Sequence, residues 1–120
     1  LATDLDKSMD LAIQTINNST RQGKDVIANY VLRQKDFDRF ENEVETQPQI
    51  VITLAPRLEV AQSKRGDREL SEWEVSRIKH HYDRGIASPK FGHIIDNSDL
   101  TLDETVDSIL HIIKNTNLDN

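Results

Sequence analysis

The sequence predicts an α/β fold in which a parallel sheet is flanked by helices. Short apolar runs of strand length alternate along the chain with amphipathic segments of helical period. Each connection between successive runs is long enough to hold a helix, which is what parallel strands require. The length of 120 residues suits one domain, so we expect residues 1–120 to form a single α/β domain.

The chain is expected to begin with a helix and a central strand. From about residue 4 to residue 21, apolar side chains recur at helical spacing, and Gly23 suits the end of that helix. Residues 25–32 are nearly continuous in apolar side chains, with β-branched residues near the start, as in strands that are covered on both faces. We therefore predict a parallel central strand over residues 25–32.

A surface helix and a second buried strand are expected next. Phe37, Phe40 and Val44 recur at helical spacing through a charged segment, and Pro48 marks the limit of this helix. Residues 50–54 are a short apolar run with the composition of a buried strand.

A charged helical flap should follow this strand. Pro56 suits the first turn of a short helix. Ser71 and Glu74 have the spacing of a capping box, so a second helix should begin there. This composition predicts a flap that projects into solvent.

A third strand and a closing helix complete the predicted fold. Residues 93–96 form a short apolar run after a Gly- and Pro-containing loop. Thr101 with Glu104 predicts the N-cap of a helix. The apolar stripe of that helix consists of Val106, Ile109, Leu110 and Ile113. Three strands are few for a sheet covered by helices, so we expect further strands, most economically before Leu1.

Composition excludes several classes of protein. The net charge of −6, from 15 Lys and Arg against 21 Asp and Glu, argues against a broad surface for nucleic acid or anionic lipid. The absence of Cys excludes disulfides and thiolate sites and fits a reducing cytoplasm. No apolar run approaches the roughly 20 residues that cross a bilayer, so we expect a cytoplasmic protein without membrane contacts.

Two arginines in a basic cluster are candidate phosphate ligands. Arg65 and Arg68 lie in the run Lys64-Arg-Gly-Asp-Arg68 of an otherwise acidic protein. Guanidinium groups suit bidentate phosphate recognition, and a mobile flap that carries them would close over a transferred phosphoryl group. The alternative is an ordinary solvated surface, in which the cations pair with Glu69, Glu72 and Glu74.

Polar residues after two predicted strands are candidate ligand contacts. Asn29 stands at the end of the central strand, and Asp96-Asn97-Ser98 follows the third strand. Ligands of open parallel sheets bind outside the carboxyl ends of the strands. The alternative is that these residues only organise turns. His80 and His81 are adjacent, so their side chains diverge by about 100° in a helix and predict no metal site.

No P-loop motif occurs in the sequence. A P-loop needs Gly-x-x-x-x-Gly-Lys-Ser/Thr so that backbone amides cradle phosphate groups. In the sole Gly-Lys pair, Gly23-Lys24, Asn18 stands where the first Gly of the motif would be, and the pair precedes a predicted strand.

Several blocks of the chain nevertheless resemble the C-terminal two-thirds of small P-loop phosphotransferases, the shikimate-kinase, chloramphenicol-phosphotransferase and nucleoside-kinase-like enzymes. The resemblance extends from about residue 23 to residue 113. The blocks are Asp25-Val-Ile-Ala-Asn-Tyr-Val-Leu32, Ile52-Thr-Leu-Ala-Pro56 with Leu58-Glu-Val-Ala61, Lys64-Arg-Gly-Asp-Arg68 with Trp73-Glu-Val75 and Ile78-Lys-His-His-Tyr82, and Ile94-Ile-Asp-Asn-Ser98 with Leu100-Thr-Leu-Asp-Glu-Thr-Val-Asp-Ser-Ile-Leu110.

The resemblance implies a P-loop NTPase-like three-layer sandwich that lacks its N-terminal strand or strands in this chain. It implies ATP and Mg²⁺ as cofactors, transfer of the γ-phosphoryl group to a small molecule, and a lid-like helical segment over residues 57–85. The implied site residues are Arg65 and Arg68 at the phosphates, Asn97 and Ser98 beside the adenine, and Asn29 and Tyr30 at the acceptor substrate. An Asn is a poor general base, so this resemblance leaves that role unassigned.

Two function hypotheses follow from the sequence. The first is a domain fragment of an ATP-dependent small-molecule kinase, inactive without its P-loop, whose partners are a nucleotide and a small acceptor. The alternative is a non-catalytic nucleotide-binding or dimerising α/β module, which would use an exposed sheet edge to form a homodimer.

Overall fold

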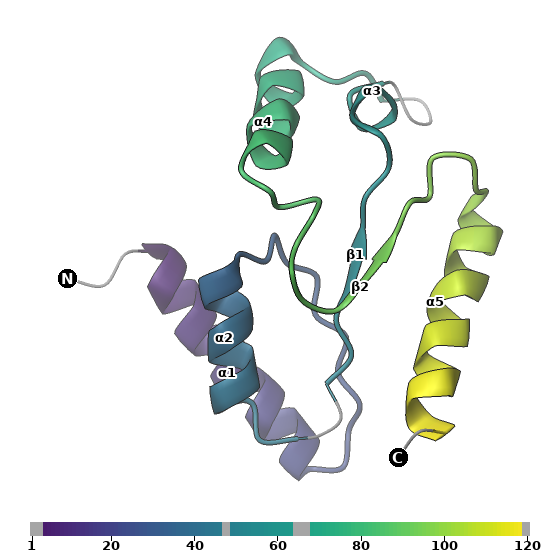
Figure 1. Ribbon diagram of the computed structural model, residues 1–120. Helices are drawn as coiled ribbons and strands as arrows, with labels where there is room; N and C mark the ends of the chain where they lie inside the picture. The colour runs from purple at the N-terminus through teal and green to yellow at the C-terminus, as the bar shows by residue number, and fades with distance from the viewer. Residues whose placement is uncertain (1–3, 47–48, 64–67, 119–120) are drawn as a thin grey trace. The chain divides into compact units, whose positions relative to one another are not determined.

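The computed structural model describes residues 4–46, 49–63 and 68–118 and places five helices and two strands in them. The chain divides into two compact units, residues 1–49 and residues 50–120, and each is described by itself (Figure 1). The elements are α1 (Asp4–Arg21), α2 (Gln34–Glu43), β1 (Ile52–Leu54), α3 (Leu58–Ala61), α4 (Glu72–Asp83), β2 (His93–Ile95) and α5 (Leu102–Leu118).

The first unit is built on an apolar cluster between two helices. Met9 and Ile13 from α1 and Val44, just after α2, are buried together. Met9 and Ile13 fall on one face of α1 because they are spaced four residues apart. The helix ends where the sequence predicts, at Arg21, and Gly23 with a φ of 80° allows the Lys24 N–H to bond the Ser19 carbonyl oxygen.

Polar contacts also join the two helical segments of this unit. The buried Asn17 side chain donates to the Glu43 carbonyl oxygen at 2.9 Å, and its own oxygen accepts from the Glu45 N–H at 2.9 Å. Arg39 of α2 donates to Asp10 of α1 at 2.7 Å and to Glu43 at 2.6 Å. Both atoms of the buried amide are thus satisfied, as a stable core requires.

The strand predicted over residues 25–32 is wrong. Residues 24–33 have no regular secondary structure, and Ile27, which a doubly covered strand would bury, is 93% exposed. A strand exists only through pairing with a neighbour, and the described residues of the first unit contain no strand. Tyr30 instead packs edge-on against Phe40 of α2, with ring centroids 6.4 Å apart.

The second unit contains the sheet, which has two strands in its described residues and not the three or more predicted for the chain. β1 and β2 are parallel and in register, with Ile52 opposite His93 and Leu54 opposite Ile95. Gly92, with a φ of 67°, lets β2 approach β1 closely: a Cβ there would lie 2.6 Å from the Val51 carbonyl oxygen. The mixed α/β character is confirmed, while the sheet is too small to define a three-layer sandwich.

The connection from β1 to β2 carries the predicted helices. In α4, the Ser71 hydroxyl accepts from the Glu74 N–H at 3.1 Å and the Glu74 carboxylate accepts from the Ser71 N–H at 3.2 Å, which confirms the capping box. Gln62, just after α3, donates its side-chain N–H to the Val75 carbonyl oxygen of α4 at 3.2 Å. The Tyr82 hydroxyl, in the last turn of α4, donates to the carbonyl oxygen of Pro56, two residues after β1.

The closing helix, α5, also begins as predicted. Glu104 N–H donates to the Thr101 hydroxyl at 3.1 Å, and the Glu104 carboxylate accepts from the Thr101 N–H at 2.9 Å. The predicted apolar stripe is only partly covered, because Val106 and Leu110 remain exposed whereas Ile109 and Ile113 are half-buried.

Candidate functional site

The carboxyl ends of β1 and β2 lie side by side because the strands are parallel and in register. Ala55, Pro56 and Arg57 follow β1, and the turn Asp96-Asn97-Ser98 follows β2. The two connections are joined directly, since the Arg57 N–H donates to the Ser98 hydroxyl oxygen at 2.7 Å. This is the edge of a parallel sheet at which ligands bind in open α/β folds.

The N–H and the hydroxyl of Ser98 are both hydrogen-bonded, and these bonds stabilise the turn. Its N–H donates to the Asp96 carboxylate at 2.9 Å, and its hydroxyl donates to the same oxygen while accepting from Arg57. The hydrogen bond from the Ser98 hydroxyl, with the one from its N–H, lowers the pKa of Asp96 below its usual value. Asp96 is therefore a carboxylate at neutral pH, and Ser98 positions the turn.

Asn97 differs from its neighbours because it is buried and incompletely satisfied. The residue is 8% exposed, and among the described residues its side-chain oxygen has no hydrogen-bond partner. A buried acceptor without a donor costs about 1–3 kcal/mol. A donor on a water molecule or on a bound ligand would satisfy it.

Arg57 is a contributor to the site that sequence reasoning did not assign. Besides its N–H contact with Ser98, its guanidinium donates to Asp99 at 3.1 Å and to Glu59 at 3.1 Å. The hydrogen bond to Asp99, followed by the one to Glu59, raises the pKa of Arg57. Its place three residues after the end of β1, directly after Pro56, is the signal that would have identified it.

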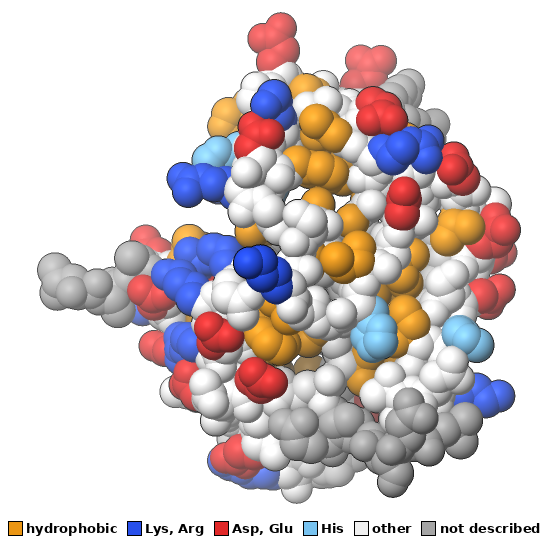
Figure 2. All heavy atoms as spheres, in the orientation of Figure 1, with side chains coloured by type: hydrophobic (Ala, Val, Ile, Leu, Met, Phe, Trp, Pro, Cys, Tyr) orange, Lys and Arg blue, Asp and Glu red, His pale blue; other side chains and the backbone are white. Residues whose placement is uncertain are grey.

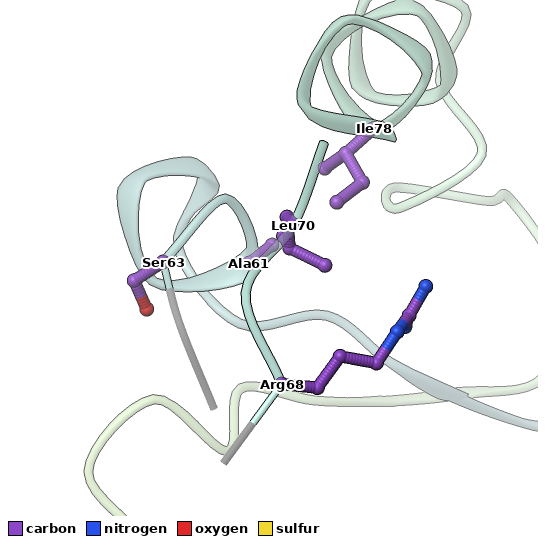
Figure 3. Close-up of a pocket in the computed structure, with 5 residues that line it drawn as sticks. All are labelled: Ala61, Ser63, Arg68, Leu70 and Ile78. Atoms are coloured by element: carbon purple, nitrogen blue, oxygen red, sulfur yellow. The ribbon is translucent and has the colours of Figure 1, made fainter. Parts of the chain in front are cut away.

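Of the two predicted phosphate ligands, Arg65 lies outside the described residues and Arg68 is visible. Arg68 is exposed and forms an ion pair with Glu74. Figure 3 shows its side chain extending beneath Leu70 and Ile78, where these residues with Ala61 and Ser63 line an open pocket of about 160 Å³. The Glu74 carboxylate also caps α4, and this contact with the Ser71 N–H is the main cause of its lowered pKa.

The two predicted substrate contacts belong to the first unit. Asn29 and Tyr30 lie in the irregular segment of residues 24–33, so neither stands at the end of a strand as the sequence analysis expected. Asn29 is exposed, and Tyr30 is held by its contact with Phe40. Their role toward an acceptor stays a prediction.

Charge and metal-binding groups are dispersed over the described surface. Figure 2 shows Lys and Arg side chains interspersed with Asp and Glu over the face that it draws. In residues 4–46, 49–63 and 68–118, no three His, Asp or Glu side chains gather as a metal site requires. None of the helices described combines the length and the apolar character of a membrane span.

No protein family, no curated protein and no solved structure matches this chain. The strand-end turn around Asn97 and the pocket beside Arg68 are therefore each a candidate site on its own geometry.

Proposed function

We propose that the chain is part of an ATP-dependent small-molecule kinase and supplies its base-binding turn and its lid. In this proposal Asn97 and Ser98 border the adenine, and Arg65 and Arg68 contact the phosphates. The observation that carries it is the buried, unpaired side-chain oxygen of Asn97 beside the carboxyl ends of two parallel strands. The resemblance of the chain to small P-loop phosphotransferases supports the same assignment.

An amide side chain is chemically suited to adenine. The exocyclic amino group of adenine is a donor and its N7 is an acceptor, so one amide can accept from the first and donate to the second. Guanine presents an oxygen where adenine has the amino group, and this oxygen would repel the unpaired acceptor of Asn97. Discrimination between the two bases therefore tests the role of Asn97 directly.

The position and pairing of Arg68 support the phosphate role. Arg68 lies on the connection that leaves β1 at Pro56 and returns toward it at Tyr82. Its partner Glu74 keeps the cap of α4 when the arginine leaves. An exposed ion pair is worth about 0–1 kcal/mol, so exchange of Glu74 for a phosphate costs little.

The phosphate cradle itself must come from a P-loop on another segment. Phosphoryl transfer depends on positioning and charge stabilisation, so this chain alone is expected to bind nucleotide without transferring phosphate. Mg²⁺ would bind with the ATP, and the cytoplasm is the expected compartment.

Nucleotide binding is tested by thermal unfolding of the chain with ATP, GTP or inorganic triphosphate. We expect ATP to stabilise by about 2.7 kcal/mol at a concentration 100-fold above its dissociation constant, and GTP to stabilise less. Asn97→Asp should weaken ATP binding at least tenfold, while Asn42→Asp, on exposed α2, should leave it unchanged. Equal stabilisation by ATP and triphosphate, or none by ATP, would contradict the base-binding turn.

Catalysis is tested with the loop supplied, in a longer version of the protein. Arg68→Ala should lower kcat by about 10²-fold or more because a charge-stabilising donor is lost. Arg84→Ala, which removes an exposed arginine just after α4, is the matched control and should leave kcat unchanged. An Arg68→Ala enzyme with normal kcat and normal KM for ATP would refute the phosphate role.

A further inference from the structure

A small pocket with apolar walls lies between α3 and α4 of the second unit. Ala61 at the end of α3, Leu70 before α4 and Ile78 within α4 supply these walls, and all three side chains are half-buried. The exposed Ser63 and Arg68 complete its lining among the described residues. The pocket has a volume of about 160 Å³. Because an apolar cavity of about 150 Å³ accommodates a benzene molecule, this pocket is large enough for one six-membered ring.

Hydrogen bonds on two sides of the pocket hold its walls in place. Gln62 donates its side-chain N–H to the Val75 carbonyl oxygen at 3.2 Å, which joins the end of α3 to α4. The capping box between Ser71 and Glu74 fixes the segment that carries Leu70 to the start of α4. The pocket is therefore preformed, as small-molecule sites usually are, and a ligand need not order these walls when it binds.

Arg68 gives this apolar pocket one cationic side. It is the single basic side chain among the described residues that line the pocket. Figure 3 shows it across the pocket from Leu70 and Ile78, with the guanidinium end turned toward them. The guanidinium holds the Glu74 carboxylate, although the Arg68 side chain is 72% exposed. A carboxylate is therefore the anion that Arg68 already binds, and an exposed ion pair of this kind exchanges readily.

We infer that this pocket binds a small aromatic monocarboxylate, with the ring against Leu70 and Ile78 and the carboxylate on Arg68. The planar guanidinium fork of an arginine matches the two oxygens of a carboxylate. The ligand carboxylate takes the place of the Glu74 carboxylate on Arg68, while Glu74 keeps its hydrogen bond from the Ser71 N–H. A ring without the anion loses the guanidinium, and an anion without the ring loses the apolar walls.

This inference goes beyond the proposed nucleotide function, although both assign an anion to Arg68. The nucleotide proposal depends on Asn97 and makes no use of the apolar walls, whereas the aromatic ligand depends on those walls and not on Asn97. Each can therefore fail without the other. One ring and one exposed guanidinium provide few contacts, so we expect a dissociation constant on the order of 1 mM.

Titration of the full chain with benzoate, followed by amide chemical shifts at constant ionic strength, tests the site. We expect saturable shifts centred on residues 60–63 and 70–82. Benzyl alcohol keeps the ring and acetate keeps the carboxylate, and each should bind at least about fivefold more weakly than benzoate. Shifts that do not saturate by about 50 mM, or acetate binding equal to that of benzoate, would overturn the inference. Stabilisation by ATP without saturable benzoate binding rejects the aromatic ligand alone, and the reverse result rejects the nucleotide alone.

Two variants separate the guanidinium from the apolar walls. Arg68→Ala should reduce the affinity for benzoate to that for benzyl alcohol, while Arg77→Ala, at an exposed arginine of α4 outside the lining, should leave it unchanged. Ala61→Leu fills the pocket and should weaken both compounds at least about fivefold. Circular dichroism checks that each variant keeps its helix content. Wild-type benzoate affinity in Ala61→Leu, or equal losses in Arg68→Ala and Arg77→Ala, would show that the ligand does not occupy this pocket.

Discussion

The two units of the chain bury different kinds of side chain. The first unit buries an apolar cluster of Met9, Ile13 and Val44, and its buried polar residues, Asn17 and Asp36, are hydrogen-bonded. In the described part of the second unit, Phe91 is the buried apolar residue, and Asn97 is buried with an unpaired oxygen. The second unit also buries Thr105, whose hydroxyl donates to the Thr101 carbonyl oxygen. The difference is that the first unit has a cluster of buried apolar side chains, whereas the described part of the second unit buries one apolar side chain and an amide oxygen without a hydrogen-bond partner.

The largest effect is expected in the apolar core of the first unit. Met9 is 2% exposed, so Met9→Ala removes a buried side chain and should cost about 2–5 kcal/mol. Hydrogen exchange followed by mass spectrometry should show lost protection in α1 and α2. Leu11→Ala, at an exposed position of the same helix, is the control. Equal loss of protection in α5 would mean that the two units unfold together and would break the comparison.

The second unit should be most sensitive at its backbone. Gly92→Ala places a Cβ 2.6 Å from the Val51 carbonyl oxygen at a positive φ, and we expect a loss of about 1–3 kcal/mol. Urea unfolding of the full chain, followed in the second unit, measures this loss in the free energy of unfolding. Gly85→Ala shares the positive φ but meets no atom within 4 Å, so it separates conformational strain from the clash and should cost less. If Gly92→Ala and Gly85→Ala lower the free energy of unfolding equally, the close approach of β1 and β2 is not the reason for glycine at position 92.

A pH effect is expected from the buried carboxylate of the first unit. Burial raises the pKa of Asp36, but hydrogen bonds from the Arg33 side chain and N–H outweigh it, so the pKa is lowered overall. The ionised Asp36 carboxylate therefore stabilises the folded state fully above the pKa of about 3.9 that an Asp has in the unfolded chain. This stabilisation is lost as the pH falls through the lower pKa of Asp36 in the folded protein. Asp36→Asn should cost about 1–2 kcal/mol at pH 7.

Urea unfolding between pH 2 and pH 7 measures this dependence. The difference between the wild-type protein and Asp36→Asn should shrink toward pH 2. Asp38→Asn, at an exposed position of α2, is the control and should keep the wild-type profile. A difference that stays constant down to pH 2 would show that the charge of Asp36 does not stabilise the fold.

The smallest losses in the free energy of unfolding are expected when surface ion pairs are removed. The loss should be larger in the first unit than in the second. Lys79 pairs only with Asp83 among the ion pairs of α4 described here, so Lys79→Ala should cost about 0.3–0.5 kcal/mol. Arg39 bridges Asp10 and Glu43, and Arg39→Ala should cost about 1 kcal/mol because two contacts are lost. Thermal unfolding in low and high salt measures both. A larger cost for Lys79→Ala would reverse the expected order.

The features predicted correctly from the sequence are those that local interactions determine. Both capping boxes, at Ser71 and Thr101, join residues three positions apart, and the end of α1 depends on one glycine. The prediction of a strand over residues 25–32 was wrong. The apolar, β-branched composition favours an extended strand, but a strand forms only when a partner that is distant in sequence pairs with it.

The candidate site divides in the same way. The turn Asp96-Asn97-Ser98 was located correctly after a strand. The bond between Ser98 and Arg57 spans 41 residues and follows from the register of β1 and β2, which no local pattern contains. The burial of Asn97 is also a tertiary property, so the sequence identified the residue without revealing its unpaired oxygen.

The hydrogen bond from Tyr82 to Pro56 closes the α3–α4 excursion at its base, 26 residues apart in sequence. Because the excursion is fastened where it departs from β1, changes in its length or composition need not alter how β1 and β2 pair. The α3–α4 excursion can therefore change its conformation while the strand-end turn keeps its shape. A phenylalanine at position 82 would release that fastening and leave the ring in place.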